Sequence, residues 1–272
     1  MEGNKREVYK SFLKTTTKLV DIYDSANLQN RKIKYLPEWL EFYTSQLLEE
    51  NNNKHKLYST YKRGTIIYVN LGSNIGNEFS GNHFCIVLDK KDNPKKSTVT
   101  VVPLSSKKSS HYTQLTSSIF DITIDELNKK AIQLIEEADK TEDFANLVMD
   151  KHENYIKSRA ERTALLIKYK YLSEEYIAKE FEELEVLIKK EAKIFKERIS
   201  NLKSRAESIS LVRKVFERHK NKQSFANVSA ITTISKKRIQ KINSEDPTGK
   251  IRISTDDLKK IEKQIIIRFI KS

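Results

Sequence analysis

The stretch RGTIIYVNLGSNIGNEFSGNHFCIVLDKKDNPKKSTVTVVPLSS, residues 63–106, decides the fold class. It holds three short runs rich in β-branched residues, which are GTIIYVNL (64–71), HFCIVLDK (83–90) and STVTVVPL (97–104). Gly, Asn-Pro and Ser bound these runs, which is typical of the strands of a compact sheet or small barrel. The triplet at 92–94, Asp-Asn-Pro, predicts the turn between the second and the third strand. We therefore expect a small β domain here.

Helices are expected before this stretch. Residues 1–50 contain two amphipathic segments, and Pro37 suits the first turn of the second one. The polar run NNNKHK, residues 51–56, then predicts a linker.

Long helices are also expected after it. Between Pro103 and Pro247 there is no proline, and between Gly81 and Gly249 there is no glycine. Apolar residues recur every seven positions at Phe181, Ile188, Phe195 and Leu202, with Leu184 in an intermediate position. This partial seam favours a helical hairpin or small bundle, and it leaves homodimerisation through the seam open.

Strand character returns in SFANVSAITTIS, residues 224–235, and a terminal helix that Thr255 can cap follows. The sequence thus predicts an α+β fold with three parts. These are a helical region at 1–60, a small β-barrel domain made of 61–120 and 223–272, and an α-helical insertion at 121–222.

Composition restricts the partners. The formal charge is +14 with a pI of about 9.5, which indicates a polyanion, and nucleic acid is the first candidate. An anionic membrane or an acidic protein partner could bind through the same charge. Alternatively, the charge reflects only the lysine-rich composition that an AT-rich genome encodes and has no binding role. Cys85 is the sole cysteine, and the histidines lack ligand spacing, so we expect neither a disulfide, nor a metal, nor a cofactor. No run has the length of a membrane span and no signal peptide precedes the helices, so a cytoplasmic protein is expected.

Several sequence elements occur in a suggestive order. They are Arg63-Gly64-Thr65-Ile66, the glycine-glutamate turn from Gly76 to His83, Pro103-Leu104-Ser105-Ser106, and the late segment from Ile231 to Arg238. In this order they resemble the PemK/MazF family of toxin endoribonucleases from type II toxin–antitoxin systems. The resemblance covers roughly 110 residues.

The resemblance implies an SH3-like β barrel, usually a homodimer, with an antitoxin partner. It also implies cleavage of single-stranded RNA without metal, through attack of the ribose 2′-hydroxyl on the adjacent phosphate. Carried over by position, the catalytic residues become His83 and Ser105. Typical toxins have arginine where this chain has His83, and a histidine there is similar to another branch of the family.

The residue types fit that chemistry on independent grounds. An imidazole can accept or donate a proton near neutrality, and Ser105 can donate a hydrogen bond to a phosphate oxygen. Lys107 and Lys108 add positive charge where phosphate should bind. Gly76 and Gly81 allow a tight turn beside the nucleic acid. The nucleic-acid contacts expected in addition to the two lysines are Glu78, Lys62, Arg63 and Ser106.

Each assignment has a structural alternative. His83 can be a structural histidine at the start of a strand, and Ser105 and Ser106 can simply end one. Glu78 can read a base edge, assist proton transfer or pair with a lysine. The run Lys236-Lys237-Arg238 is either an RNA-binding patch or a solvated turn.

Three functions remain in competition. The first is the metal-independent endoribonuclease. The second is an inactive nucleic-acid-binding or regulatory module on the same barrel, and the third is a helical interaction protein that uses the barrel as a scaffold. A neighbouring gene for a short acidic protein would favour the toxin.

Overall fold

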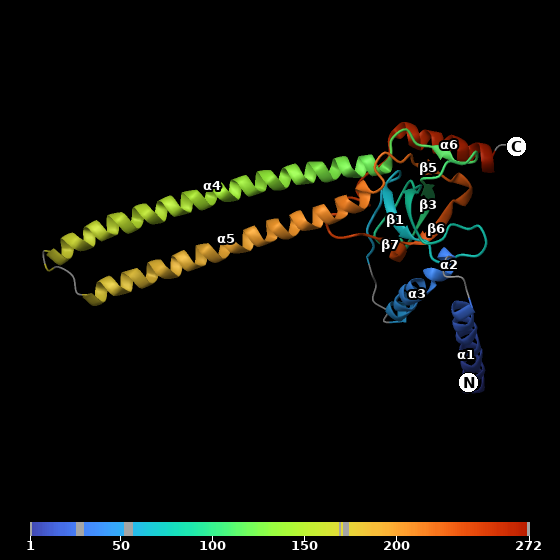
Figure 1. The fold of residues 1–272 in the computed structure, drawn as a ribbon, viewed down its shortest axis with the longest axis horizontal. Coiled ribbons are helices and arrows are strands. Elements are labelled where there is room, and N and C mark those ends of the chain that lie inside the picture. Colours follow the sequence, from blue (N-terminus) through green and yellow to red (C-terminus); the bar gives the residue numbers. More distant parts are fainter. Residues whose placement is uncertain (1, 26–29, 52–56, 169, 171–173, 271–272) are drawn as a thin grey trace. The chain divides into compact units, whose positions relative to one another are not determined.

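The structure is a computed structural model that describes residues 2–25, 30–51, 57–168, 170 and 174–270. It has the expected α+β composition and divides into two compact units. The first is drawn from residues 1–119, 221–241 and 248–272, and the second from 120–220 and 242–247. Figure 1 labels the helices and most of the strands.

Three antiparallel strands form the centre of the first unit. They are β1 (Ile66–Asn70), β2 (Asn82–Val87) and β3 (Thr98–Ser105), with Ile67 opposite Cys85 and Ile86 opposite Val102. Their β-branched side chains fill the core together with Cys85, whose burial also raises the pKa of its thiol. The three strands expected from the sequence are thereby confirmed.

Four short strands complete the sheet: β4 (Thr113–Gln114), β5 (Phe225–Ala226), β6 (Thr232–Ser235) and β7 (Ile239–Gln240). The hydrogen-bonded order is β4-β5-β3-β2-β1-β7, and β6 pairs with the outer part of β3. The C-terminal fifty residues therefore supply strands to both sides of the central three.

The sheet is not closed into a barrel, so the closed SH3-like barrel expected above is wrong in this respect. Between β6 and β7 lies a 3₁₀ turn, η2 (Lys236–Arg238), whose cap Ser235 accepts a hydrogen bond from the Lys237 amide. The backbone is not extended at this turn. On its two sides β6 pairs with β3 and β7 pairs with β1, and β6 and β7 do not pair with each other. An open seven-stranded sheet results.

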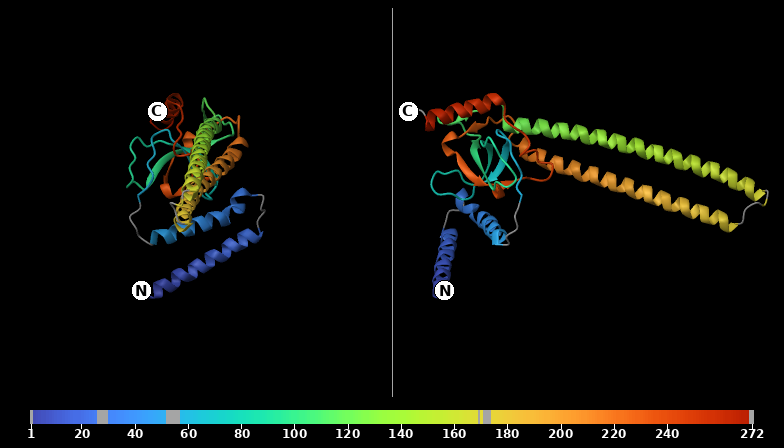
Figure 2. Two further views of the ribbon diagram at one scale, coloured as in Figure 1. Left: turned by 90° about the vertical axis from the view of Figure 1, so that its left-hand side faces the viewer. Right: turned by 180° about the vertical axis from the view of Figure 1, so that it is seen from behind.

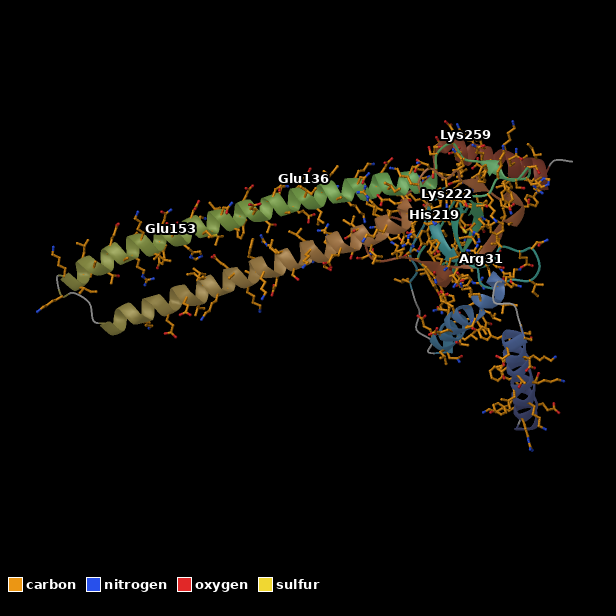
Figure 3. The ribbon with its side chains drawn as sticks, viewed as in Figure 1. Arg31, Glu136, Glu153, His219, Lys222 and Lys259 are labelled. Atoms are coloured by element: carbon orange, nitrogen blue, oxygen red, sulfur yellow. The ribbon has the colours of Figure 1, made fainter. Side chains whose placement is uncertain are left out.

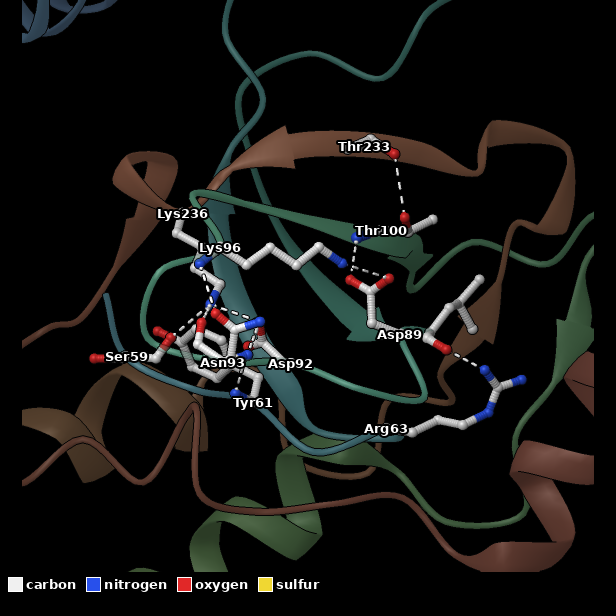
Figure 4. Close-up of polar contacts among 11 residues, drawn as sticks. Ser59, Tyr61, Arg63, Asp89, Asp92, Asn93, Lys96, Thr100, Thr233 and Lys236 are labelled. Atoms are coloured by element: carbon white, nitrogen blue, oxygen red, sulfur yellow. Dashed lines mark hydrogen bonds and ion pairs between the residues drawn. The ribbon is translucent and has the colours of Figure 1, made fainter. Parts of the chain in front are cut away.

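A buried ion pair fixes η2. Lys236 Nζ lies 2.8 Å from Asp92 Oδ1, and each side chain is 2% exposed. The Lys236 ammonium also donates to the Ser59 carbonyl at 2.9 Å, and the Tyr61 amide donates to Asp92 Oδ2 at 2.9 Å (Figure 4). Three segments far apart in the sequence meet at this pair.

Helices precede and follow the sheet in the first unit. N-terminal to it are α1 (Glu2–Ser25), α2 (Arg31–Lys34) and α3 (Leu36–Asn51), with Pro37 in the first turn of α3 as expected. Residues 52–56 of the expected linker lie outside the described residues. Helix α6 (Thr255–Phe269) is capped by Ser254, whose Oγ accepts from the Asp257 amide, and not by Thr255. In Figure 2 α6 lies beside the sheet.

The second unit is a helical hairpin. Helices α4 (Ile119–Lys168) and α5 (Glu174–Glu217) run side by side in Figures 1 and 2. Cross-helix pairs such as Glu137–Arg205 join them, and Figure 3 shows side chains projecting along both helices. Of the expected seam, Ile188 and Phe195 line an apolar pocket of about 640 Å³ between the helices, whereas the side chains of Phe181 and Leu184 lie outside the described residues.

The segment 242–247 also belongs to this unit. Glu245 pairs with Lys130 at 2.9 Å and Arg205 at 3.5 Å, and Asn243 donates to the Ser208 carbonyl at 2.9 Å. In the described parts of the chain, no helix combines the length and the apolarity needed to cross a membrane.

Candidate functional site

His83 stands near the start of β2, directly after the glycine-glutamate turn, and lies opposite Val69 of β1. Its ring is half-buried and contacts the edge of the Phe79 ring at a centroid distance of 4.8 Å. Nδ1 lies 3.3 Å from the Leu104 carbonyl oxygen, and Nε2 lies 3.1 Å from the Ser80 carbonyl oxygen. The ring is thus oriented by one strand contact and one loop contact.

The surroundings of His83 favour its neutral form. Burial is the largest effect and lowers the pKa of the imidazole. The Leu104 and Ser80 carbonyls raise the pKa by accepting from the protonated ring, and the positive charge of Arg31 lowers it again. The net pKa lies below the ordinary value of about 6.5, so near pH 7 the ring is neutral.

Ser105 ends β3 beside His83. The β2–β3 register pairs Cys85 with Pro103, and beyond this pair the carbonyl oxygen of Leu104, the residue before Ser105, lies 3.3 Å from His83 Nδ1. Ser105 Oγ accepts a hydrogen bond from the Lys107 amide at 3.0 Å, which holds the hydroxyl in a local turn. The structure therefore brings the two residues expected to be catalytic to one end of the sheet.

Ser106, Lys107 and Lys108 follow directly in the exposed loop after β3. Their side chains stand in solvent, and their position in the chain keeps them close to Ser105. This arrangement gives the end of β3 a local positive charge, which suits an anionic ligand.

The loop between β1 and β2, residues 71–81, forms one wall of a groove. Gly76 and Gly81 both have positive φ, +58° and +81°, which fits the tight turn expected there. Glu78 is exposed and lines a groove of about 890 Å³. Its opposite wall consists mainly of the stretch from Asn227 to Ser235.

The late basic run separates into three roles. Lys236 is buried in the ion pair with Asp92, and Lys237 pairs with Glu50 at 3.4 Å. Arg238 lines the groove, donates to the Leu71 carbonyl at 3.2 Å and stacks on Trp39 at 5.1 Å from the ring. The run is therefore neither a continuous patch nor a solvated turn. Only its last residue faces the groove, and sequence reasoning did not single it out.

Lys62 and Arg63 stand at the opposite end of the β1–β2 ladder, where Ile66 pairs with Ile86. The Arg63 guanidinium pairs with Glu262 of α6 at 2.7 Å and donates to the Leu88 carbonyl. The structure does not bring this end of the ladder together with His83. Arg63 instead ties α6 to the sheet.

His83, Ser105, Lys107 and Lys108 are residue types that acid–base chemistry on a phosphate ester requires. They offer a neutral imidazole, a hydroxyl that can donate, and cations beside them. Comparison with known proteins gives one family match. Residues 62–137 match the model of the family described as PemK-like, MazF-like toxin of type II toxin-antitoxin system.

Residues 62–137 form a PemK/MazF-like toxin domain. This confirms the resemblance inferred from the sequence and covers β1 to β4 and the start of α4, with helices before and after. PemK/MazF toxins are mRNA interferases, typically endoribonucleases, and the family implies an RNA substrate and an antitoxin partner. No curated protein matches the chain. The late segment that contains Arg238 lies outside the matched residues and joins the PemK/MazF-like domain through β6 and β7.

Proposed function

We propose that this chain is a metal-independent endoribonuclease that cleaves single-stranded RNA, as the toxin of a type II toxin–antitoxin pair. The observation that carries the proposal is that His83 Nδ1 lies 3.3 Å from the carbonyl oxygen of Leu104, the residue before Ser105, within a PemK/MazF-like domain. A polyanionic substrate also agrees with the net charge of +14.

The reaction begins with the ribose 2′-hydroxyl. Neutral His83 accepts its proton, and the 2′-oxygen attacks the adjacent phosphorus. Ser105 donates a hydrogen bond to a non-bridging oxygen as negative charge builds on the phosphorane, with Lys107 and Lys108 adding positive potential. The bond from phosphorus to the 5′-oxygen then breaks, and that oxygen takes a proton from water, which leaves a 2′,3′-cyclic phosphate and a 5′-hydroxyl. The protonated His83 then gives its proton to the resulting hydroxide, so that the step balances.

The groove of about 890 Å³ is the proposed path of the RNA beside the reacting phosphate. Arg238 supplies a guanidinium that can bind a phosphate, and Glu78 supplies a carboxylate that can accept from a base edge. The hydroxyls of Thr232 and Thr233 add donors and acceptors along the same wall. The proposal also includes an antitoxin that covers this groove. It further includes a homodimer in which the groove extends onto the second subunit.

One observation favours a second candidate, an RNA-binding or regulatory module without catalysis. Both ring nitrogens of His83 face backbone carbonyl oxygens, so neither is free to accept a proton as the residues now lie. In that case the helical hairpin would serve as the protein-interaction element.

A cleavage assay separates the two candidates. His83→Ala should reduce the rate of RNA cleavage at least about a hundredfold, the usual scale for a positioned acid or base, while the protein still folds. The matched control is His152→Ala, which removes a histidine that pairs with Glu191 in the helical hairpin. The wild-type assay is repeated with a chelator, and the product ends are analysed for the cyclic phosphate.

Full activity in folded His83→Ala would remove this histidine from the mechanism. Loss of wild-type activity with chelator would contradict the metal-independent scheme. RNA binding without cleavage by the wild type would favour the regulatory module.

A further inference from the structure

The loop 71–81 covers one nitrogen of His83. The Ser80 carbonyl oxygen lies 3.1 Å from Nε2, and the loop keeps its shape through internal hydrogen bonds. Asn74 Nδ2 donates to the Phe79 carbonyl at 2.7 Å, and the Gly81 amide donates to the Gly72 carbonyl at 2.6 Å. Ser80 is thereby held against the imidazole.

The covered nitrogen is the one that a general base needs. Nδ1 faces the Leu104 carbonyl of β3, which is part of the sheet and stays in place. A neutral imidazole has one N–H, and when Nδ1–H donates to Leu104, the lone pair belongs to Nε2. That lone pair then faces the Ser80 oxygen, an acceptor that offers it no proton. His83 can accept a proton from RNA only after the loop withdraws Ser80.

Residues 31–51, here called the N-terminal brace, hold this loop from outside. The Lys32 ammonium donates to the Asn74 carbonyl at 2.8 Å and also to the Gly76 carbonyl. In return, the Ser73 hydroxyl donates to the Lys32 carbonyl at 3.3 Å. A single ammonium thus crosses the turn of the loop and joins two of its backbone carbonyls to α2.

Helix α3 adds a second contact at the base of the loop. The Trp39 ring packs so closely on Gly72 that a Cβ at this glycine would lie 2.7 Å from it. The same ring supports the Arg238 guanidinium. Trp39 therefore contacts both the base of loop 71–81 and Arg238, which lines the groove described above.

We propose that the N-terminal brace is an autoinhibitory element that holds loop 71–81 in the position where Ser80 occupies Nε2 of His83. The brace itself follows from the contacts above, and its effect on catalysis rests on the proposed endoribonuclease function. Release of the brace frees the loop, uncovers the imidazole and activates the enzyme.

The first test measures access to His83 without RNA. Diethyl pyrocarbonate acylates accessible neutral imidazoles, and mass spectrometry of the peptide with His83 gives the rate. Lys32→Met in the full chain should raise this rate and the amide exchange of residues 72–81 by roughly tenfold, the scale of losing a charge-assisted hydrogen bond. Lys34→Met is the matched control, because Lys34 lies in the same helix and contacts the Tyr35 ring.

Trp39→Leu provides an independent variant, with Tyr35→Leu as its control. It should also increase the reaction at His83 if the melting temperature shows that the sheet still folds. Unchanged acylation and exchange in both Lys32→Met and Trp39→Leu would overturn the brace.

RNA cleavage by the same proteins separates the two proposals. Faster cleavage by Lys32→Met, together with faster acylation, is the expected result. Faster acylation of Lys32→Met, with no RNA cleavage by the wild type or any variant, would support the brace and contradict the endoribonuclease proposal. Slower cleavage by Lys32→Met would overturn autoinhibition, because the brace would then organise the site.

Discussion

Replacement of Lys236 by Met should destabilise the first unit strongly. The lysine and Asp92 are each 2% exposed and lie 2.8 Å apart, so the substitution leaves a buried carboxylate without its cation. Breaking a buried pair in this way costs about 3–5 kcal/mol in free energy of unfolding. Since domains are stable by only about 5–15 kcal/mol, the loss is a large share of the total.

Urea denaturation followed by tryptophan fluorescence measures this cost. Trp39 is the sole tryptophan and contacts Arg238 of η2, so its emission reports on the first unit. With an m-value of about 2 kcal/mol/M, the midpoint should fall by about 2 M urea. The control is Lys237→Met, which breaks a pair with Glu50, a residue that is 57% exposed, and should cost at most about 1 kcal/mol.

The pKa of Asp92 provides a further check. Burial raises this pKa, but hydrogen bonds from Lys236, the Tyr61 amide and the Asn93 amide outweigh it, so the pKa lies below its ordinary value. Without Lys236 the pKa must rise, and protonation at low pH relieves the buried charge. The difference between wild type and Lys236→Met should therefore shrink as the pH falls below about 4. Equal midpoints for Lys236→Met and Lys237→Met at pH 7 would refute the reasoning.

Three further predictions concern activity and architecture. Because the pKa of His83 is lowered, the acid limb of the plot of kcat/KM against pH should have its midpoint below about pH 6.5. Arg31→Met removes a positive charge that lowers this pKa, so it should move the midpoint to higher pH. An unchanged midpoint would show that Arg31 does not act on His83. Replacing Lys107 and Lys108 together by Ala should flatten the plot of log affinity for single-stranded RNA against log salt by roughly 1.4, and an unchanged slope would argue against phosphate contacts there. Joining Ile119 to Ser224 by a short Gly/Ser linker should leave a folded β domain, because the two residues are close: the Ile119 amide donates to Ser224 Oγ at 3.2 Å. Circular dichroism of the shortened chain should show less helix and a cooperative melt. An unfolded product would contradict the proposed insertion.

The central strands were predictable because their signal is local. Ile66 to Asn70 and Thr98 to Ser105 alternate or run as β-branched residues within a few positions, and their burial follows from that pattern. The approach of His83 to the end of β3, where its Nδ1 lies 3.3 Å from the Leu104 carbonyl oxygen, was accessible only through the resemblance, since the two strand ends are far apart in the sequence.

The remaining features depend on partners distant in the sequence. Lys236 looks like any lysine in a basic run, and only Asp92, 144 positions earlier, explains why it is buried. In the sequence Arg63 looks like an RNA-binding arginine, but in the structure it pairs with Glu262, which lies 199 positions later. The lack of closure likewise depends on pairings between distant strands, since β6 pairs with β3 and β7 pairs with β1.

The position of β6 has a consequence for synthesis of the chain on the ribosome. This strand pairs with β3 through Val101 and Thr232, about 130 residues apart, and the two long helices lie between them. At about 5–20 residues per second, roughly 7 to 26 seconds pass between synthesis of the edge of β3 and synthesis of its partner strand. Helices form in microseconds, so α4 and α5 fold while the sheet is still incomplete. A ribosome therefore finishes nearly all of this chain before the groove wall that carries Arg238 exists, and a truncated product ending within the helices lacks that wall.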